Sequence, residues 1–118
     1  MTQTESGAAL DHILAALADP TRRQVIDLLR ERPRRAGELA AAFGIAAPLM
    51  SKHLRILRVT RLIEEARLDT DARVRLYQLR PQPFEQLQTW LETVQALWAD
   101  QLDAFKQHVE AGLRQAEP

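Results

Sequence analysis

Side chains that can bind a nucleic acid are concentrated between residues 47 and 55. Ser51, Lys52 and Arg55 would occupy neighbouring positions on one face of a helix. Lysine and arginine can neutralise phosphate or read guanine O6 and N7, and serine can bond a base edge. Leu49 can contact a thymine methyl group. If this face points outward, we expect DNA major-groove contacts from Ala47, Pro48, Leu49, Ser51, Lys52 and Arg55. An ordinary solvated helix face is the alternative interpretation.

Patterns typical of enzymes and metal sites are missing from the sequence. The chain contains no cysteine, which excludes disulfides, thiolate-bound zinc and thiol catalysis. It has no Gly-rich phosphate loop and no histidine paired with carboxylates in a pattern suited to acid–base chemistry. We therefore expect no catalytic residues, no bound metal and no cofactor.

The net charge of zero conceals a strong segregation of charge along the chain. Residues 20–80 hold fourteen Arg and Lys against seven Asp and Glu, a net charge of +7. The segments 1–19 and 81–118 carry −3 and −4. A basic block between acidic flanks is the footprint expected of a polyanion binder, although a solvated surface can also produce it.

Length and composition predict a single compact domain over residues 1–118. Its 46% hydrophobic content is enough to bury a core without disulfides. No stretch reaches the ~18 apolar residues of a membrane span, and residues 1–7 lack the features of a signal peptide. We expect a cytoplasmic protein that has no membrane partner.

Two helices are predicted at the start of the chain. Apolar residues at helical spacing indicate a first helix over residues 8–18. Asp19 is a good N-cap, and Pro20 suits the first position of a second helix, which Pro33 ends. Arg22 and Arg23 of this second helix are weaker candidates for phosphate contacts, since salt bridges to Asp27 or Glu31 would explain them.

A helix-turn-helix is predicted next. Residues 36–43 read as a short helix, and Gly44 suits the left-handed conformation that closes it. Pro48 lies in the first turn of the following helix. His53 leans toward the core side of that helix, which favours a packing role over a base contact. The expected buried stripe consists of Met50, Leu54 and Leu57.

A β-hairpin is predicted directly after the helix-turn-helix. Alternating apolar and polar residues over 63–79, interrupted by a polar turn, are typical of paired strands, and a hairpin in this place is a wing. Arginines here can contact phosphate or enter the minor groove, or can merely protect an edge strand from aggregation. The additional DNA candidates are Arg67, Arg73 and Arg75 of the wing, and Arg34 and Arg35 before residue 36.

One long helix is predicted over residues 83–114. It would reach roughly 45 Å, well beyond the diameter of a small winged domain, so its apolar stripe needs a partner. A second copy of the chain is the simplest partner for this stripe. The helices within residues 1–19 and 83–114 would then form the dimer interface, and residues 20–80 would be the DNA-binding core. The expected dimer contacts are Leu10, Ile13, Leu14, Leu87, Trp90, Leu91, Val94, Trp98, Leu102 and Phe105.

The order and spacing of several short motifs resemble the ArsR family of bacterial winged helix-turn-helix repressors. They are residues 18–23 (ADPTRR), 37–40 (GELA), 50–58 (MSKHLRILR) and 62–63 (LI). The C-terminal part looks like a branch of the family commonly found beside START-like small-ligand-domain proteins. The resemblance implies a mainly α fold with a small β-hairpin: five helices, a two-stranded wing and a long C-terminal dimerisation helix.

The same resemblance implies a homodimeric, sequence-specific repressor. Such a protein would bind an inverted repeat near its own promoter and be released by a signal, carried by a small molecule or a protein. The chain departs from many relatives in having Ala46-Ala47 where they have Ser-Gln, and Arg61 where they have Gly. These departures prevent the transfer of an operator sequence.

Thiolate metal sensing is absent from this chain. The arsenic and cadmium sensors of the family carry a Cys-x-Cys pair at the positions of Arg35 and Gly37. Some relatives hold zinc between their last helices, but the spacing of the corresponding Asp, Glu and His residues here does not repeat their pattern. The alternative function is a winged-helix module that binds a protein and no DNA, which the charge of residues 20–80 disfavours.

Overall fold

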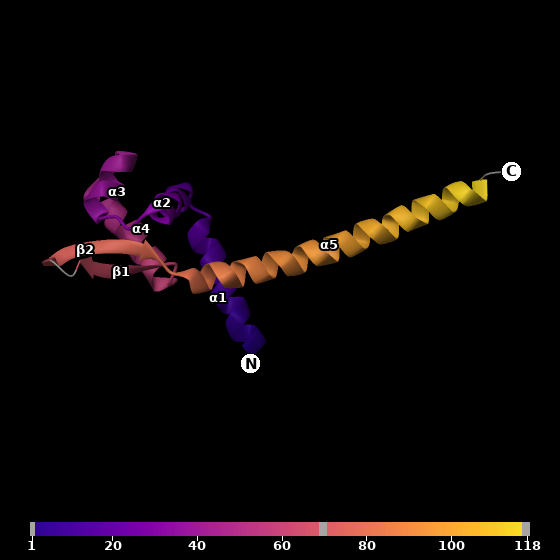
Figure 1. Cartoon of the computed structure of the whole chain (residues 1–118), viewed down its shortest axis with the longest axis horizontal. Helices are drawn as coiled ribbons and strands as arrows, with labels where there is room; N and C mark the ends of the chain where they lie inside the picture. Colours follow the sequence, from indigo (N-terminus) through magenta and orange to yellow (C-terminus); the bar gives the residue numbers. More distant parts are fainter. Residues whose placement is uncertain (1, 69–70, 117–118) are drawn as a thin grey trace. The chain divides into compact units, whose positions relative to one another are not determined.

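Helices dominate the computed structural model of the chain. It describes the backbone of residues 2–68 and 71–116 and the side chains of residues 7–67 and 74–116. These residues form five helices and one antiparallel hairpin (Figure 1). The elements are α1 (Thr2–Leu17), α2 (Pro20–Glu31), α3 (Ala36–Phe43), α4 (Ala47–Val59), β1 (Ile63–Leu68), β2 (Asp71–Leu79) and α5 (Pro81–Ala116). The chain divides into two compact units, Met1–Glu85 and Gln86–Pro118.

The corner between α1 and α2 forms as predicted. Asp19 is the N-cap of α2, and its side chain accepts a hydrogen bond from the backbone N–H of Arg22 at 3.1 Å. This bond is the main reason why the pKa of Asp19 lies below its ordinary value. Pro20 opens the helix, because its fixed φ suits the first turn. The helix α1 begins at Thr2 rather than at residue 8 as predicted.

Gly44 closes α3 in the left-handed conformation, with φ 62°. The N–H of Ile45 donates to the carbonyl of Ala40 at 3.1 Å, and the N–H of Gly44 donates to Ala41 at 3.3 Å. These two bonds form a Schellman motif, which satisfies the last carbonyls of the helix. The prediction for Gly44 is therefore confirmed.

Arg61 closes α4 with the same motif at φ 61°, where a residue other than glycine is strained. The N–H of Leu62 donates to Leu57 at 2.9 Å, and the N–H of Arg61 donates to Arg58 at 3.0 Å. This is the position at which many relatives were expected to have Gly. The departure noted in the sequence thus lies at a backbone position that favours glycine.

Strands β1 and β2 form the predicted hairpin. The register pairs Ile63 with Leu79 and Arg67 with Arg75, and a bulge interrupts it between Arg67 and Leu68. The backbone of Arg34 also bridges to that of β2 through two hydrogen bonds of 2.8 and 3.1 Å. That bridge attaches the last part of β2, at Tyr77, to the segment that leads into α3.

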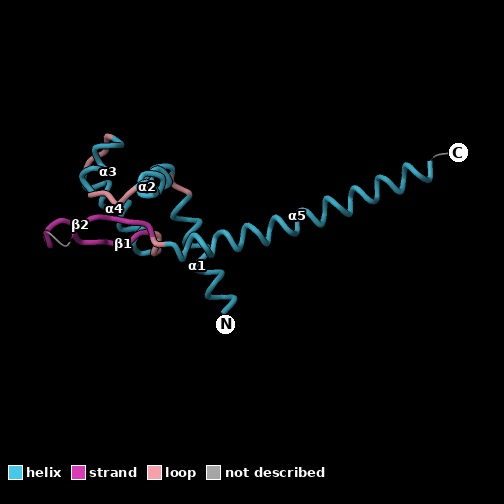
Figure 2. Tube along the Cα trace, in the orientation of Figure 1, coloured by secondary structure: helices cyan, strands magenta, loops and turns pink. Residues whose placement is uncertain are grey.

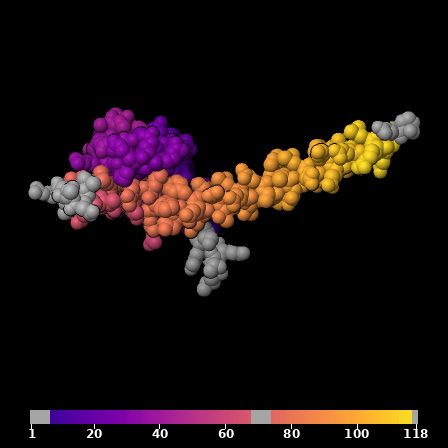
Figure 3. All heavy atoms as spheres, viewed as in Figure 1, coloured from indigo at the N-terminus to yellow at the C-terminus, as the bar shows by residue number. Residues whose placement is uncertain are grey.

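The core of the first unit lies between the helices and the hairpin. Figures 1 and 2 show α2 and α3 on one side of the hairpin, and in the space-filling view this part of the chain forms a continuous mass beside it (Figure 3). The predicted stripe of α4 is buried in this core. The largest fully buried side chains are Val25, Leu39, Met50, Leu54, Leu57, Leu62 and Ile63.

The helix α5 extends the prediction of 83–114 at both ends. Its first five residues, 81–85, belong to the first unit, where Phe84 packs against the core. All described residues of the second unit, 86–116, are helical. None of the helices, within the residues described, is long and apolar enough to span a membrane.

Candidate nucleic-acid interface

The helix α4 presents its predicted DNA face to solvent. One side of the helix is buried through Met50, Leu54 and Leu57, which fixes which residues point outward. His53 lies at the border of the two sides and is half-buried, as its predicted packing role requires. The six predicted groove residues are all exposed: Ala47, Pro48, Leu49, Ser51, Lys52 and Arg55.

The start of α4 lacks a side-chain cap. Ala46 occupies the N-cap position with φ −65° and ψ 144°, and its side chain accepts no hydrogen bond. The first turn is held instead by the backbone carbonyl of Ala46, which accepts from Leu49 and Met50, each at 3.1 Å. The loss of a capping hydroxyl expected from the Ala46-Ala47 departure is therefore real.

Some basic residues of α4 form ion pairs within the protein and others do not. Arg58 pairs with Glu65 at 3.1 Å. Lys52 and Arg55 make no ion pair or side-chain hydrogen bond with any residue that the structure describes. An exposed cation without an acidic partner is free to neutralise a phosphate. Lys52 and Arg55 therefore differ from Arg58, whose charge is neutralised by an ion pair.

Arg67 and Arg75 are direct cross-strand partners in the hairpin. Both side chains are exposed, and neither has an acidic partner among the described residues. Like charges placed directly opposite each other weaken a sheet, and a polyanion would relieve that repulsion. Arg73 lies in β2, but its side chain is outside the described residues.

Arg34 does not contribute a free charge, contrary to its predicted phosphate contact. Its guanidinium pairs with Glu31 at 2.7 Å and with Glu38 at 3.9 Å, and donates to the carbonyl of Leu28 at 3.2 Å. Glu38 also accepts from Arg32 at 3.0 Å, which is the main cause of its lowered pKa. These ion pairs link the end of α2 to α3 and neutralise the charge of Arg34.

Arg35 is the N-cap residue of α3 and has an exposed side chain. Its backbone N–H donates to the carboxylate of Glu38 at 3.5 Å, so the acid steadies the first turn of the helix. No ion pair of the described residues involves the Arg35 guanidinium. Of the two arginines predicted here, only Arg35 is left free for a phosphate.

The salt bridges expected for Arg22 and Arg23 within α2 do not form. Arg22 instead donates to the carbonyls of Ala16 and Ala15, at 2.7 and 3.4 Å, and Arg23 donates to that of Leu17 at 3.3 Å. Both arginines therefore hold the end of α1. The expectation failed because it considered only acidic partners on the same helix.

Sequence reasoning missed the last turn of α4. A shallow hollow there is lined by Arg55, Arg58 and Val59, and Val59 is 74% exposed. Val59 lies four residues after Arg55, so helical spacing could have added it to the same face. Arg61, which follows, is exposed and unpaired among the described residues.

The apolar residues predicted for dimer contacts have unequal exposure. Ile13 is only 2% exposed and belongs to the core of the first unit, so it is removed from the candidate contacts. Leu10 and Leu87 are half-buried, and Leu14 is exposed. The exposed candidates on α5 are Trp90, Leu91, Val94, Trp98, Leu102 and Phe105, and Leu97, Val109 and Leu113 are exposed as well.

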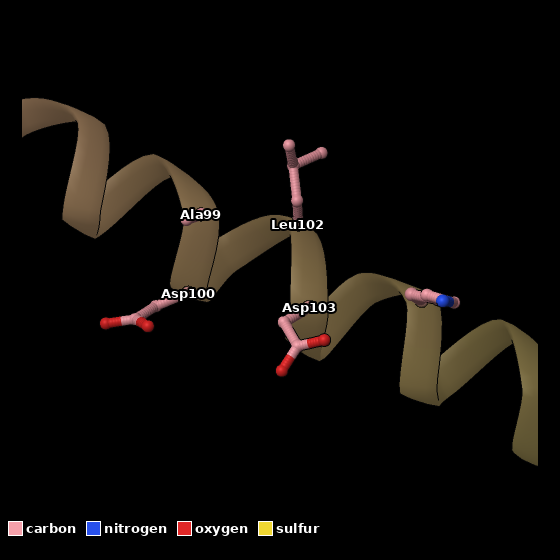
Figure 4. Close-up of a pocket in the computed structure, with 5 residues that line it drawn as sticks. Ala99, Asp100, Leu102 and Asp103 are labelled. Carbon is pink, nitrogen blue, oxygen red and sulfur yellow. The ribbon is translucent and has the colours of Figure 1, made fainter.

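Acidic residues on α5 do not assemble a metal site. In Figure 4, Leu102 projects from the helix away from Asp100 and Asp103. These residues line a shallow surface together with Ala99 and Lys106. Within the part of the chain that the structure describes, no group of three or more His, Cys, Asp or Glu could hold a metal ion.

Known proteins resemble this chain in sequence. Residues 19–65, which run from the N-cap of α2 into β1, match the model of the bacterial regulatory protein arsR family. The HTH-type transcriptional regulator Rv2034 of Mycobacterium tuberculosis is 33% identical over 101 residues, covering 86% of this chain and 89% of that protein. The transcriptional repressor SdpR of Bacillus subtilis is 38% identical over 58 residues, covering 49% and 64%.

Solved structures of ArsR-type regulators have a similar fold. The ArsR family transcriptional regulator RHA00566 has 35% sequence identity and a TM-score of 0.70, over 79% of this chain and 93% of that one. An ArsR-like transcriptional regulator from Rhodococcus sp. RHA1 has 27% identity and a TM-score of 0.73, over 87% and 94%. The predicted five-helix fold with its wing is thus confirmed.

Proposed function

Because the chain belongs to the ArsR family of bacterial regulatory proteins and is a DNA-binding transcriptional regulator, we propose that it represses transcription as a homodimer on an inverted-repeat operator. Regulators of this family bind double-stranded DNA and are not enzymes. The name of SdpR supports the repressor role. Autoregulation at its own promoter, a location in the cytoplasm and an effector other than a thiolate-bound metal complete the proposal.

The observation that carries the proposal is the set of free cations. Lys52 and Arg55 on α4, and Arg67 and Arg75 on the hairpin, lack acidic partners among the described residues, whereas their neighbours Arg58 and Arg34 are paired. In the proposed complex α4 lies in the major groove, where Ser51, Lys52 and Arg55 meet base edges and phosphates. The hairpin arginines contact the phosphates or the minor groove beside it.

Exposed apolar side chains support the homodimer. On α5 they recur at helical spacing and include two tryptophans and Phe105, which is 66% exposed. A contiguous apolar surface of this kind marks an interaction site, and a second copy is the commonest partner. Residues 1–19 and 83–114 would form the interface, and residues 20–80 would bind DNA.

Footprinting of the DNA upstream of the gene tests the proposal. We expect protection of two half-sites related by an inverted repeat, about 34 Å or one helical turn apart. Protection of a single half-site would contradict the dimer. A stable complex with another protein, combined with no protection of any duplex, would favour the alternative of a winged-helix protein-binding module.

A further inference from the structure

The side chain of Arg22 contacts two other helices besides its own. Its Nε donates to the carbonyl of Ala16 at 2.7 Å, and one terminal nitrogen lies 3.4 Å from the carbonyl of Ala15. The other terminal nitrogen lies 3.4 Å from Nδ1 of His53. All three guanidinium nitrogens are therefore engaged, and they join the end of α1 to the middle of α4.

The end of α1 depends on partners from outside the helix. The last carbonyls of any helix lack intrahelical donors, and the negative end of the helix dipole favours a nearby cation. The last turn of α1 contains no basic residue of its own. Arg22 supplies donors for Ala15 and Ala16, and its backbone is fixed by the Asp19 cap.

His53 lies between the buried stripe of α4 and its DNA face. It directly follows Lys52 and precedes the buried Leu54. Because arginine can only donate, the contact at 3.4 Å requires Nδ1 to accept and the ring proton to lie on Nε2. The contact therefore restrains rotation of α4 about its axis, and this rotation sets the direction in which Lys52 and Arg55 point.

We propose that Arg22 is a positioning residue for DNA binding, which ties α4 to the end of α1 and so couples the state of α1 to the DNA-reading face. This inference rests on the proposed function. Leu10 and Leu14 of α1 are proposed dimer contacts. A movement of the partner subunit against α1 would therefore be transmitted by Arg22 to α4 and would change the orientation of Lys52 and Arg55. In this role Arg22 acts through α4 rather than on DNA directly, since three of its five N–H donors are already bound within the protein.

The test compares four full-length variants and one double variant with the wild-type protein in fluorescence anisotropy titrations of operator and random duplexes. Arg22→Gln and His53→Leu each remove one partner of the contact, and the double variant combines them. His53→Asn can place an amide oxygen near the position of Nδ1 as an acceptor. Arg23→Gln is the matched control, because among the described residues the Arg23 side chain bonds to the carbonyl of Leu17 alone and not to α4. Circular dichroism at the assay temperature verifies that each variant is folded.

We expect Arg22→Gln and His53→Leu each to weaken operator binding by roughly fivefold or more, the lower end of typical coupling effects. The double variant should bind no more weakly than the weaker-binding single variant, because both substitutions remove one interaction. His53→Asn should recover most of the affinity, and Arg23→Gln should retain it. Binding to random duplex and the salt slope should stay unchanged, since the same phosphates are neutralised in every variant.

Additive effects in the double variant, or equally weakened binding to operator and random DNA, would overturn the positioning role. A salt slope that falls by about one in Arg22→Gln would reveal that Arg22 binds a phosphate directly. Amide hydrogen exchange without DNA gives an independent reading: Arg22→Gln should speed exchange in both α1 and α4, and unchanged α4 exchange would overturn the coupling. Failure of the wild-type protein to bind any duplex would contradict the proposed function, whatever the exchange result.

Discussion

Arg55 and Arg58 lie three residues apart on α4, but the protein uses their guanidinium groups differently. Arg58 is held by Glu65 of β1 at 3.1 Å, whereas Arg55 has no acidic partner among the described residues. The sequence alone predicted the exposed face, because the buried stripe at Met50, Leu54 and Leu57 determines it. It could not predict which arginines are neutralised, since their partners lie on other elements.

Removal of the free cations should change the salt dependence of DNA binding. For Lys52→Ala and Arg55→Ala, we expect weaker binding and a salt slope that falls by about 0.9 for each phosphate that the variant no longer neutralises. Arg114→Ala on the acidic C-terminal segment removes the same charge and should leave the slope unchanged. Titrations at several salt concentrations measure this. Equal slopes in all variants would show that Lys52 and Arg55 do not bind phosphate.

Asp19 should make stability depend on pH in acid. Its pKa is lowered in the folded protein, chiefly by the hydrogen bond from the Arg22 backbone, so its ionised form stabilises the fold. This contribution is present above the ordinary value of about 3.9 and is lost as pH falls through the lowered pKa. Asp19→Asn retains a capping side chain but cannot ionise. Urea unfolding should show a wild-type advantage at pH 7 that shrinks by pH 3, and an advantage independent of pH would contradict this assignment.

At the scale of elements, local chemistry predicted the corners of the fold well. The N-cap at Asp19, the left-handed Gly44 and the alternation over 63–79 each indicated an element that the structure contains. The start of α1 at Thr2 was missed, because periodicity detects only the buried face of a helix. The contacts of Arg22 were missed as well, since they join residues that are distant in the sequence.

The two Schellman motifs provide a matched pair of stability tests. Arg61→Gly should raise the free energy of unfolding by about 1 kcal/mol, because glycine adopts positive φ without steric cost. Gly44→Ala should lower it by about 1 kcal/mol for the same reason. An added Cβ at Gly44 would have no atom within 4 Å, so clashes would not contribute. Urea denaturation measures both free energies of unfolding. If Arg61→Gly lowers the free energy of unfolding, the Arg61 side chain stabilises the fold by more than the strain of its positive φ destabilises it.

At the scale of the whole molecule, the basic and acidic segments of the sequence coincide with the proposed DNA-binding and dimerisation regions. The segment of +7 contains α2, α3, α4 and the hairpin, and the acidic flanks contain α1 and α5. An apolar stripe without a partner was predictable from its periodicity. Its geometry with a second copy was not, because an interface depends on two surfaces and the sequence displays only one.

Phe105→Glu should weaken the homodimer. The side chain is 66% exposed on α5, so a glutamate there leaves the folded chain intact but puts a charge into the proposed interface. We expect light scattering to show a dimer for the wild-type protein and a monomer for the variant at micromolar concentration. Lys106→Glu introduces a carboxylate at the adjacent position and should remain dimeric. A wild-type monomer would contradict the proposed assembly.

If the free cations on α4 and the hairpin bind duplex DNA, wild-type binding must depend steeply on salt. Fluorescence anisotropy with the DNA upstream of the gene gives the association constant at a series of salt concentrations. We predict that its logarithm falls linearly with the logarithm of salt concentration, with a slope of about −0.9 for each phosphate neutralised. Binding that is independent of salt, or no binding to this DNA, would contradict the proposed role of these cations.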